Sequence, residues 1–232
     1  MLSKFSTIPT QLFLAGFLYF LALSLVASAQ QSAVDTASQP FAEEIEAFKK
    51  ADRQKMPPKD AILFVGSSSI RQWTTLKEDF SNKEVINRGF GGSQFSDLLR
   101  YDDQIVYPYK PRQIFIYEGD NDLNAGNSPE QVLQDFKAFV KRSRERLPET
   151  ELVFISIKPS PSRIDLFEEM KEANQLIKAY SKETQNIRYA DIFHAMLDED
   201  GEIRTDIFTE DMLHLNAKGY DLWERIIRPY LD

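Results

Sequence analysis

Short apolar runs alternate with segments of helical periodicity along most of this chain. The runs are nearly continuous in hydrophobicity, as in strands buried on both faces, so we expect a parallel sheet covered by helices. The expected strands are 61–65, 84–86, 113–117, 152–157 and 187–190. The expected helices are 41–50, 129–146, 165–181 and 217–230. This order predicts one α/β domain built around a central parallel sheet.

The N-terminal segment has the organisation of a secretory signal peptide. Lys4 gives the positive region, residues 12–26 form an apolar stretch of 15 residues, and 27–29 read Ala-Ser-Ala, a small-residue cleavage site. A membrane-spanning helix needs roughly 20 residues, so we favour cleavage after Ala29 over an uncleaved anchor. We expect a signal peptide at 1–29, a linker with an N-terminal helix at 30–58, and the main domain at 59–232. The protein is then exported by a bacterium to the periplasm or the medium, without a stable membrane anchor.

Composition narrows the class of function. The chain has 36 acidic and 28 basic residues and no long basic run, so nucleic acid is not an expected partner. It contains no cysteine, which excludes disulfides and thiolate metal sites and suits export by a bacterium. Its two histidines are 20 residues apart and have no closely spaced ligand set around them. We therefore expect no metal and no cofactor.

Four polar segments follow expected strands. They read Gly-Ser-Ser-Ser at 66–69, a glycine-rich stretch at 87–93, Gly-Asp-Asn-Asp at 119–122 and, after a longer excursion, Asp-Met-Leu-His at 211–214. Each alone could be an ordinary turn or a helix cap. Because ligands of parallel sheets bind at the carboxyl ends of the strands, we expect all four segments at one edge of the sheet, in a shared site.

The residue types in these segments suit acyl transfer. Asp211 precedes His214 by three residues, a spacing at which one helical turn points both side chains the same way. A carboxylate beside an imidazole fixes its tautomer, and such a base can activate one of the serines at 67–69. Gly92 has no side chain to block its backbone N–H, and Asn121 carries a side-chain amide, so both offer hydrogen bonds to an oxyanion.

The order Ser, Gly, Asn, His, with an aspartate three residues before the histidine, resembles the SGNH hydrolases, also called GDSL esterases/lipases. It looks most like their bacterial branch related to platelet-activating-factor acetylhydrolase subunits, over about residues 61–232. The resemblance implies a three-layer α/β/α, flavodoxin-like domain that hydrolyses an ester through a serine acyl-enzyme. Carried over position by position, it implies these roles: Ser68 as nucleophile and first oxyanion donor, Gly92 and Asn121 as further donors, His214 as base and Asp211 as its orienting acid.

Two of these assignments have competitors in the sequence. The usual Gly-Asp-Ser of the family reads Gly-Ser-Ser here, with Ser67 in place of the aspartate, and the choice of Ser68 among three adjacent serines rests on the resemblance. His194 also lies three residues after an aspartate, Asp191. Nothing after His194 resembles the last motif of the family, so we interpret it as a structural or surface residue.

The loops favour a small ester as the substrate. The loop candidates 94–103, 120–128 and 158–163 are short and polar, and offer little apolar area to a long acyl chain. We expect an esterase for short acyl groups, first of all acetyl, on a small molecule or carbohydrate. The alternatives are a lysophospholipase or lipase acting on lipids, and a catalytically silent carbohydrate-binding module on the same fold. Residues 158–161 are expected to wall the pocket, and Arg71, Trp73 and Arg88 to line its entrance. The sequence leaves the oligomeric state open.

Overall fold

The computed structural model describes residues 39–231. The chain divides into two compact units, residues 1–43 and 44–232, and the fold below is that of the second unit. The expected signal peptide and the first part of the expected linker lie outside the described residues. Within the described part, no helix is long and apolar enough to cross a membrane.

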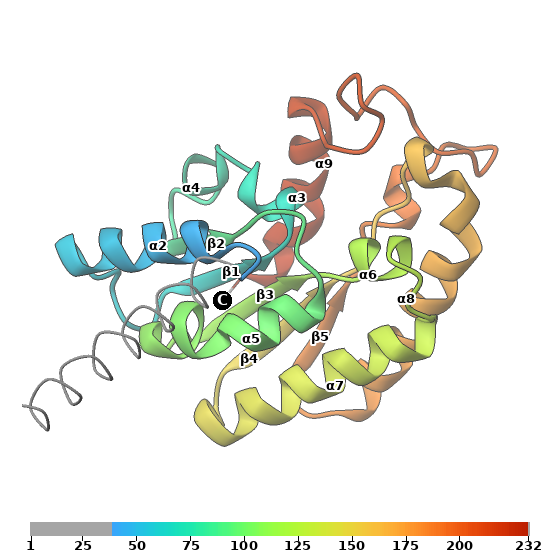
Figure 1. The fold of residues 1–232 in the computed structure, drawn as a ribbon. Helices are drawn as coiled ribbons and strands as arrows, with labels where there is room; N and C mark the ends of the chain where they lie inside the picture. Colours follow the sequence, from blue (N-terminus) through green and yellow to red (C-terminus); the bar gives the residue numbers. More distant parts are fainter. Residues whose placement is uncertain (1–38, 232) are drawn as a thin grey trace, which may run out of the picture. The chain divides into compact units, whose positions relative to one another are not determined.

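In the described part of the chain, five parallel strands form one sheet (Figure 1). They are β1 (Ile62–Gly66), β2 (Val85–Gly89), β3 (Gln113–Tyr117), β4 (Glu151–Ile155) and β5 (Ile187–Ala190). Their order across the sheet is β2-β1-β3-β4-β5, and every neighbouring pair is parallel. This is the flavodoxin-like order of doubly wound proteins. The predicted α/β fold with a central parallel sheet is confirmed.

Helices precede, connect and follow these strands. They are α2 (Ala42–Gln54), α3 (Ser68–Arg71), α4 (Leu76–Asp79), α5 (Phe95–Ile105), α6 (Asp120–Asn124), α7 (Pro129–Arg146), α8 (Phe167–Glu183) and α9 (Ala217–Ile227). Short 3₁₀ segments are η1 (Tyr107–Tyr109), η2 (Pro161–Leu166), η3 (His194–Met196) and η4 (Arg228–Tyr230). The helix expected at 129–146 has its expected bounds, whereas the one expected at 165–181 begins as η2 and continues as α8.

One face of the sheet is covered by α3, α4 and α9 (Figure 1). Successive residues of a strand point to opposite faces, so alternate residues of β1 and β3 belong to this face. Phe64 stacks on Phe115 with 4.5 Å between ring centroids. Trp73, between α3 and α4, meets Trp223 of α9 edge to face at 6.1 Å. Burial of these large rings is the main stabilising contribution on this side.

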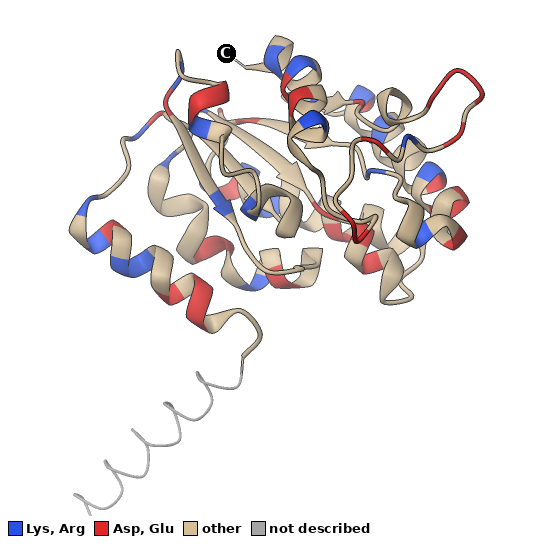
Figure 2. Cartoon of the chain, turned by 90° about the horizontal axis from the view of Figure 1, so that it is seen from above, with Lys and Arg blue, Asp and Glu red and all other residues tan. Residues whose placement is uncertain are grey.

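The opposite face is covered by α5, α7 and α8 (Figure 1). Phe95 of α5 and Phe136 of α7 both pack on Phe154 of β4, at ring-centroid distances of 6.4 and 5.0 Å. Both helices thereby bury an apolar stripe at helical spacing. Lys and Arg are interspersed with Asp and Glu on the helices of the domain (Figure 2).

Residues 94–103, expected to be a loop, instead form most of α5. The backbone N–H of Gln94 donates to Oδ2 of Asp97 at 3.2 Å, which satisfies a donor at the start of the helix. The helix then buries Leu98, Tyr101 and Ile105. Charged residues between these positions make the helical period hard to recognise in the sequence. The segment forms a helix because its apolar residues then pack against the apolar face of the sheet.

Strand β2 runs beyond its expected end at residue 86, up to Gly89. Its polar residues have specific partners, which is why the strand can continue through them. Asn87 donates to the carbonyl of Ile70 at 2.7 Å, and Nε of Arg88 donates to the hydroxyl of Tyr109 at 2.7 Å. A prediction from hydrophobicity ends the strand too early, at the first of these polar residues.

Backbone hydrogen bonds join the carboxyl ends of β1, β2 and β3. Ser67 donates to the carbonyl of Tyr117 at 3.2 Å, and Phe90 donates to the carbonyl of Gly66 at 3.0 Å. Gly66 has φ +144°, and a Cβ there would lie 2.1 Å from the oxygen of Tyr117, so the turn requires glycine. Three of the four polar segments therefore meet at the carboxyl edge of the sheet.

Candidate active site

The fourth segment reaches the same edge through Ser68 and His214. Ser68 begins α3 directly after β1, and its Oγ lies 3.0 Å from Nε2 of His214. Nδ1 of the same imidazole lies 2.6 Å from Oδ2 of Asp211. The three side chains form one hydrogen-bonded chain, in which a carboxylate orients an imidazole that can take a proton from the serine.

A turn, and not the expected helical turn, brings Asp211 and His214 together. Met212 between them has a left-handed φ of +53°. Oδ1 of Asp211 accepts the backbone N–H groups of Leu213 and His214 at 2.9 Å, and the hydroxyl of Thr209 at 2.7 Å. A carboxylate that satisfies local N–H groups competes with helix formation. Slight burial opposes ionisation, but the hydrogen bonds from His214, Leu213 and Thr209 outweigh it and hold the pKa of Asp211 well below its ordinary value.

The second histidine has the same local pairing and no nucleophile. Nδ1 of His194 lies 2.9 Å from Oδ1 of Asp191, and Asp191 also pairs with Lys178 at 3.0 Å. The His194 side chain is 72% exposed, against 21% for His214. The interpretation of His194 as a surface residue therefore agrees with its position.

Two of the three expected oxyanion donors, Gly92 and Asn121, are neighbours. Asn121 lies in α6, within the segment 120–128 expected to be a loop, and its Nδ2 donates to the carbonyl of Ser93 at 2.9 Å. A Cβ on the exposed Gly92 would lie 3.8 Å from the same nitrogen. A side chain at position 92 would thus stand beside the Asn121 amide, where an oxyanion would have to approach.

Two buried carboxyl groups lie behind these donors. Ser93 donates its hydroxyl to Oε1 of Glu118 at 2.7 Å, and Asp122 accepts the backbone N–H groups of Phe95 at 3.0 Å and Gly119 at 3.1 Å. Burial, reinforced by the charge of Asp122, raises the pKa of Glu118 well above its ordinary value. Burial also raises the pKa of Asp122 to about 7. Within residues 39–231, no cluster of three or more metal-ligating side chains could hold a metal ion.

Residues 158–161 were expected to wall the pocket, and the first three of them are buried. Nζ of Lys158 lies 2.5 Å from Oδ2 of Asp120, which also accepts the hydroxyl of Tyr117 at 3.2 Å and lies 3.4 Å from Nη1 of Arg163. Burial opposes ionisation of Asp120, but the two cations outweigh it and hold its pKa below the ordinary value. This cluster could not be foreseen from the sequence, because a lysine is almost never fully buried unless it is paired, and the partner of Lys158 is 38 positions away in the chain.

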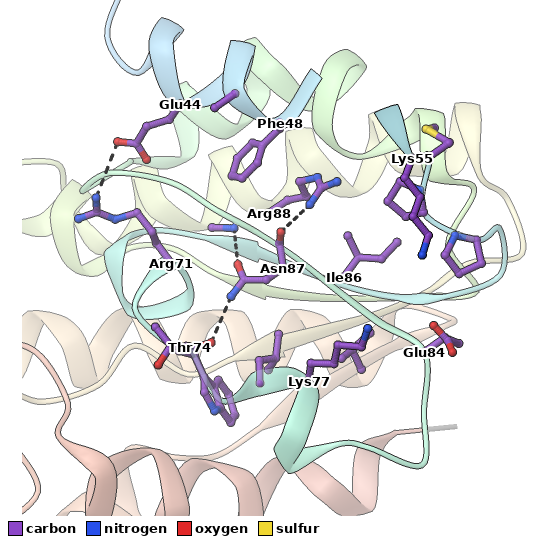
Figure 3. Close-up of a pocket in the computed structure, with 18 residues that line it drawn as sticks. Glu44, Phe48, Lys55, Arg71, Thr74, Lys77, Glu84, Ile86, Asn87 and Arg88 are labelled. Atoms are coloured by element: carbon purple, nitrogen blue, oxygen red, sulfur yellow. Dashed lines mark hydrogen bonds and ion pairs between the residues drawn. The ribbon is translucent and has the colours of Figure 1, made fainter. Parts of the chain in front are cut away.

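A pocket of about 720 Å³ lies between α2, β2 and the segment around α3 and α4 (Figure 3). Arg71, Trp73 and Arg88 line it, whereas Ser68 and His214 do not. The expectation that these three residues line the entrance of the catalytic site stays a prediction, and Trp73 also belongs to the aromatic core.

Helix α2 borders this pocket and contacts the glycine-rich segment, a contact that the sequence did not reveal. Oε2 of Glu44 accepts the backbone N–H of Gly91 at 2.8 Å. Oε1 of Glu44 lies 4.0 Å from the guanidinium of Arg71, toward which it points in Figure 3. Gly91 immediately precedes Gly92, so Glu44 holds the backbone that carries one of the expected oxyanion donors.

A parallel sheet with a Ser–His–Asp chain at its carboxyl edge is the architecture of an α/β hydrolytic enzyme. Comparison with known families specifies the class further. The model of the GDSL-like Lipase/Acylhydrolase family matches residues 65–222, which is more than half of the chain. The chain belongs to this family of SGNH acylhydrolases and is a carboxylic-ester hydrolase. The resemblance noted in the sequence is thereby confirmed.

Individual proteins show the same relationship. The human platelet-activating factor acetylhydrolase IB subunit alpha1 is 27% identical over 176 residues, which cover 73% of this chain and 74% of the human one. A structure from Streptococcus pneumoniae, provisionally described as a platelet activating factor, has a TM-score of 0.74 at 23% identity and covers 89% of this chain and 99% of its own. A variant of a Geobacillus acetyl-xylooligosaccharide esterase has a TM-score of 0.60 at 14% identity, covering 74% of this chain and 94% of its own. Both structures show that the fold is shared.

Proposed function

We propose that this protein is an exported esterase that removes short acyl groups, above all acetyl, from a polar alcohol such as a sugar, through a serine acyl-enzyme. The observation that carries the proposal is the hydrogen-bonded chain from Ser68 Oγ through His214 to Asp211, with distances of 3.0 and 2.6 Å. Two adjacent hydrogen-bond donors, at Gly92 and Asn121, support it.

In the first half of the reaction, Ser68 Oγ attacks the ester carbonyl while Nε2 of His214 takes its proton. The carbonyl oxygen becomes negative, and the N–H groups of Ser68, Gly92 and Asn121 stabilise it. Asp211 keeps Nδ1 of His214 protonated and stabilises the imidazolium. Collapse of the tetrahedral intermediate breaks the ester C–O bond, and the imidazolium protonates the departing alcohol. In the second half, water attacks the acyl-enzyme by the same route and releases the acid.

Covalent labelling tests this mechanism and the silent-module alternative together. A fluorophosphonate should label the protein at Ser68, because its phosphorus accepts the activated serine and its oxygen mimics the oxyanion. Ser68→Ala and His214→Ala should both prevent labelling. A folded protein that neither labels nor hydrolyses nitrophenyl acetate would support a catalytically silent module.

A second candidate substrate, an ester with a longer acyl chain or a lipid, is favoured by a specific pair of side chains. Ile164 and Met212 are 54% and 38% exposed. Ser162, two residues before Ile164, donates its N–H to the carbonyl of Met212 at 3.1 Å, so the segment after β4 adjoins the catalytic turn. Exposed apolar side chains on the catalytic turn and on the segment bonded to it could contact an acyl chain, and each buried CH₂ contributes about 0.8 kcal/mol.

The two substrate classes predict opposite dependence on chain length. For an acetyl esterase, kcat/KM should fall in the order nitrophenyl acetate, butyrate, octanoate and palmitate. A maximum of kcat/KM at octanoate or palmitate would favour the hypothesis of a lipid-directed enzyme. In that case Ile164→Ser and Met212→Ser should lose activity on the long esters only. Met56→Ser is the matched control, because Met56 is also exposed, at 49%, but lines the pocket beside α2.

Export is the part of the proposal that rests on the N-terminal sequence alone. The positive residue, the apolar stretch and the Ala-Ser-Ala site at 27–29 support it. Expression of the full chain in a bacterium, followed by fractionation and N-terminal sequencing, should find the protein outside the cytoplasm, beginning at Gln30. A cytoplasmic protein that keeps its first residues would contradict this part and leave the esterase proposal standing.

A further inference from the structure

Arg163 contacts the Asn121 side chain from across the site. Nη2 of Arg163 donates to Oδ1 of Asn121 at 2.9 Å, and Nη1 donates to the backbone carbonyl of Asp120 at 2.8 Å. The two elements are far apart in sequence: Arg163 lies in η2 after β4, and Asn121 lies in α6 after β3. The Arg163 side chain is only 12% exposed, so its guanidinium is largely committed to the protein.

This contact decides which way the Asn121 amide faces. An amide has an oxygen end and a nitrogen end of nearly the same size, and its orientation is set by its partners. A guanidinium can only donate, so Arg163 requires the oxygen on its side. The carbonyl of Ser93 can only accept, so it requires the nitrogen on the other side, where Nδ2 lies at 2.9 Å. Rotation of the amide by half a turn would place donor against donor and acceptor against acceptor.

The amide nitrogen carries two N–H groups, and the bond to Ser93 uses one of them. The fixed orientation therefore leaves the other N–H for a negative oxygen. Gly92 adjoins this amide, because its ideal Cβ would lie 3.8 Å from Nδ2 and 4.0 Å from Oδ1. A reversed amide would present its oxygen to that space, which repels an oxyanion.

Arg163 is itself held in place by a buried ionic cluster. Oδ2 of Asp120 lies 3.4 Å from Nη1 of Arg163 and 2.5 Å from Nζ of Lys158. Asp120 and Lys158 are 4% and 1% exposed. Two cations share one carboxylate, so the cluster has a net positive charge next to the Asn121 backbone. In a poorly solvated site, such a charge also favours a developing negative oxygen.

We propose that Arg163 is a positioning residue of the oxyanion hole, which locks the Asn121 amide so that one N–H faces the tetrahedral intermediate. The inference rests on the proposed serine-esterase function and adds a residue outside the four motifs of the site. It acts through Asn121 and does not touch the substrate. Its loss should therefore lower kcat and leave KM nearly unchanged, because an oxyanion-hole hydrogen bond strengthens mainly in the transition state.

The test is a double-mutant cycle between positions 163 and 121, measured as kcat and KM on nitrophenyl acetate. Asn121→Ala should lower kcat by about 10²–10³-fold, the usual cost of losing an oxyanion donor. Arg163→Ala should lower kcat by about tenfold or more. In the Asn121→Ala background the same change should cost less than about twofold, since there is no amide left to orient. Arg163→Met keeps much of the side-chain volume without its donors and carries the test if the alanine variant does not fold.

Two further variants separate positioning from general stabilisation. Arg163→Lys keeps a donor and a charge, and should retain more kcat than Arg163→Met. Arg144 is the matched control: its guanidinium donates to the backbone carbonyls of Thr150, at 2.7 Å, and Asn186, at 2.9 Å, away from the site. Arg144→Ala should lower the melting temperature without a selective loss of kcat.

Three results would overturn the inference. The first is a rise in KM at constant kcat, which would mean that Arg163 binds the substrate. The second is a loss of kcat from Arg163→Ala that is just as large in the Asn121→Ala background. The third is a loss of kcat in Arg144→Ala equal to that in Arg163→Ala. If the unaltered protein neither hydrolyses the ester nor reacts with a fluorophosphonate, the proposed function itself fails and the inference fails with it. An active enzyme with an additive cycle contradicts the role of Arg163 alone.

Discussion

At the scale of the residue, neighbouring side chains of the same type have different surroundings. Ser68 is partly exposed with its Oγ 3.0 Å from His214. Ser67 is 1% exposed, and its hydroxyl has no hydrogen-bond partner in the described part of the chain. A buried hydroxyl without a partner lowers stability, because it loses water and gains no replacement bond. Ser67, which stands where the family usually has aspartate, is thus a buried residue whose hydroxyl has no polar partner among the described residues.

Substitution of the serines one at a time should separate them. Ser68→Ala should lower kcat by roughly 10³-fold or more, because removal of one triad member disables the unit. Ser67→Ala should keep most activity and leave the melting temperature unchanged or higher, since it removes an unpaired buried hydroxyl. Ser69→Ala should also keep most activity. Steady-state kinetics and thermal unfolding measure both effects, and a folded Ser67→Ala that is as inactive as Ser68→Ala would contradict the assignment.

The two histidines should differ in the same way. His214→Ala should abolish turnover, because no other base lies within hydrogen-bond distance of Ser68 in the described residues. His194→Ala removes a side chain that is 72% exposed and should change neither kcat nor the melting temperature noticeably. Activity on nitrophenyl acetate and the rate of phosphonate labelling are the measurements. Equal losses in the two variants would show that the histidine contacting Ser68 is not the base.

At the scale of the element, helix α2 holds the strand edge and the loop after it. Asp52 pairs with Arg88 of β2 at 2.5 Å and accepts the hydroxyl of Tyr109 at 2.5 Å, and Glu44, about two turns earlier on the helix, accepts the N–H of Gly91. Arg88 also lies over the Phe48 ring, 4.9 Å from its centroid. The helix therefore does more than precede the domain: its acidic side chains fix β2 and the backbone that leads to Gly92.

Removal of the Glu44 carboxylate should loosen that backbone. Gly91 is buried, so its N–H would be left without a partner, which costs about 1–3 kcal/mol when no water replaces it. We expect Glu44→Ala to lower kcat several-fold with little change in KM, and Glu44→Gln to recover much of the loss because its amide oxygen can still accept. Glu46→Ala is the control, since its partners Lys49 and Arg53 are on the same helix. Equal kcat in the Glu44→Ala and Glu46→Ala variants would contradict the role of Glu44.

At the scale of the whole molecule, stability depends on acidic groups that are buried beneath the site. The folded state favours the protonated forms of Glu118 and Asp122, because burial raises the pKa of both. The unfolded chain releases these protons at about pH 4, so the folded state loses stability as the pH rises above that value. The contribution of Asp122 levels off near its pKa of about 7, and that of Glu118 continues above it. Asp211 acts in the opposite direction, since its lowered pKa removes stability as the pH falls through the acidic range.

Replacement of Glu118 by glutamine isolates one of these contributions. Glutamine is neutral, and its oxygen can accept the Ser93 hydroxyl bond now made at 2.7 Å. Between pH 5 and 8 the free energy of unfolding of Glu118→Gln should fall less steeply than that of the unaltered protein, by up to about 1.4 kcal/mol per pH unit. Urea unfolding followed by tryptophan fluorescence measures the slope. Glu168→Gln, at a side chain that is 75% exposed, should leave it unchanged. Parallel slopes for Glu118→Gln and the unaltered protein would show that Glu118 is ionised in the fold.

The sequence by itself determined the fold and the motifs, because both depend on local patterns: the spacing of apolar residues and short runs of polar residues after the strands. Strand β3 and helix α7 have the bounds that their apolar positions predict, and α7 begins with a Ser128 cap and Pro129. The carboxyl ends of parallel strands lie at one edge, so residues 66–69, 87–93 and 119–122 were expected together. Phe90 is indeed hydrogen-bonded to Gly66, and the Asn121 side chain to Ser93. The polar strand β2 and the amphipathic helix α5 were misjudged, because their periods are interrupted by polar residues whose partners lie elsewhere.

The resemblance of the motifs pointed to Ser68, Asp211 and His214, but the contacts between their side chains are made by the tertiary structure. Both histidines have an aspartate three residues before them, and only the course of the chain after β5 brings His214, and not His194, to Ser68. The contacts of Glu44 with Gly91 and of Arg163 with Asn121 join residues 47 and 42 positions apart. Such contacts leave no local pattern, because a hydrogen bond between distant segments depends on how whole elements pack, and not on the residues beside it in the chain.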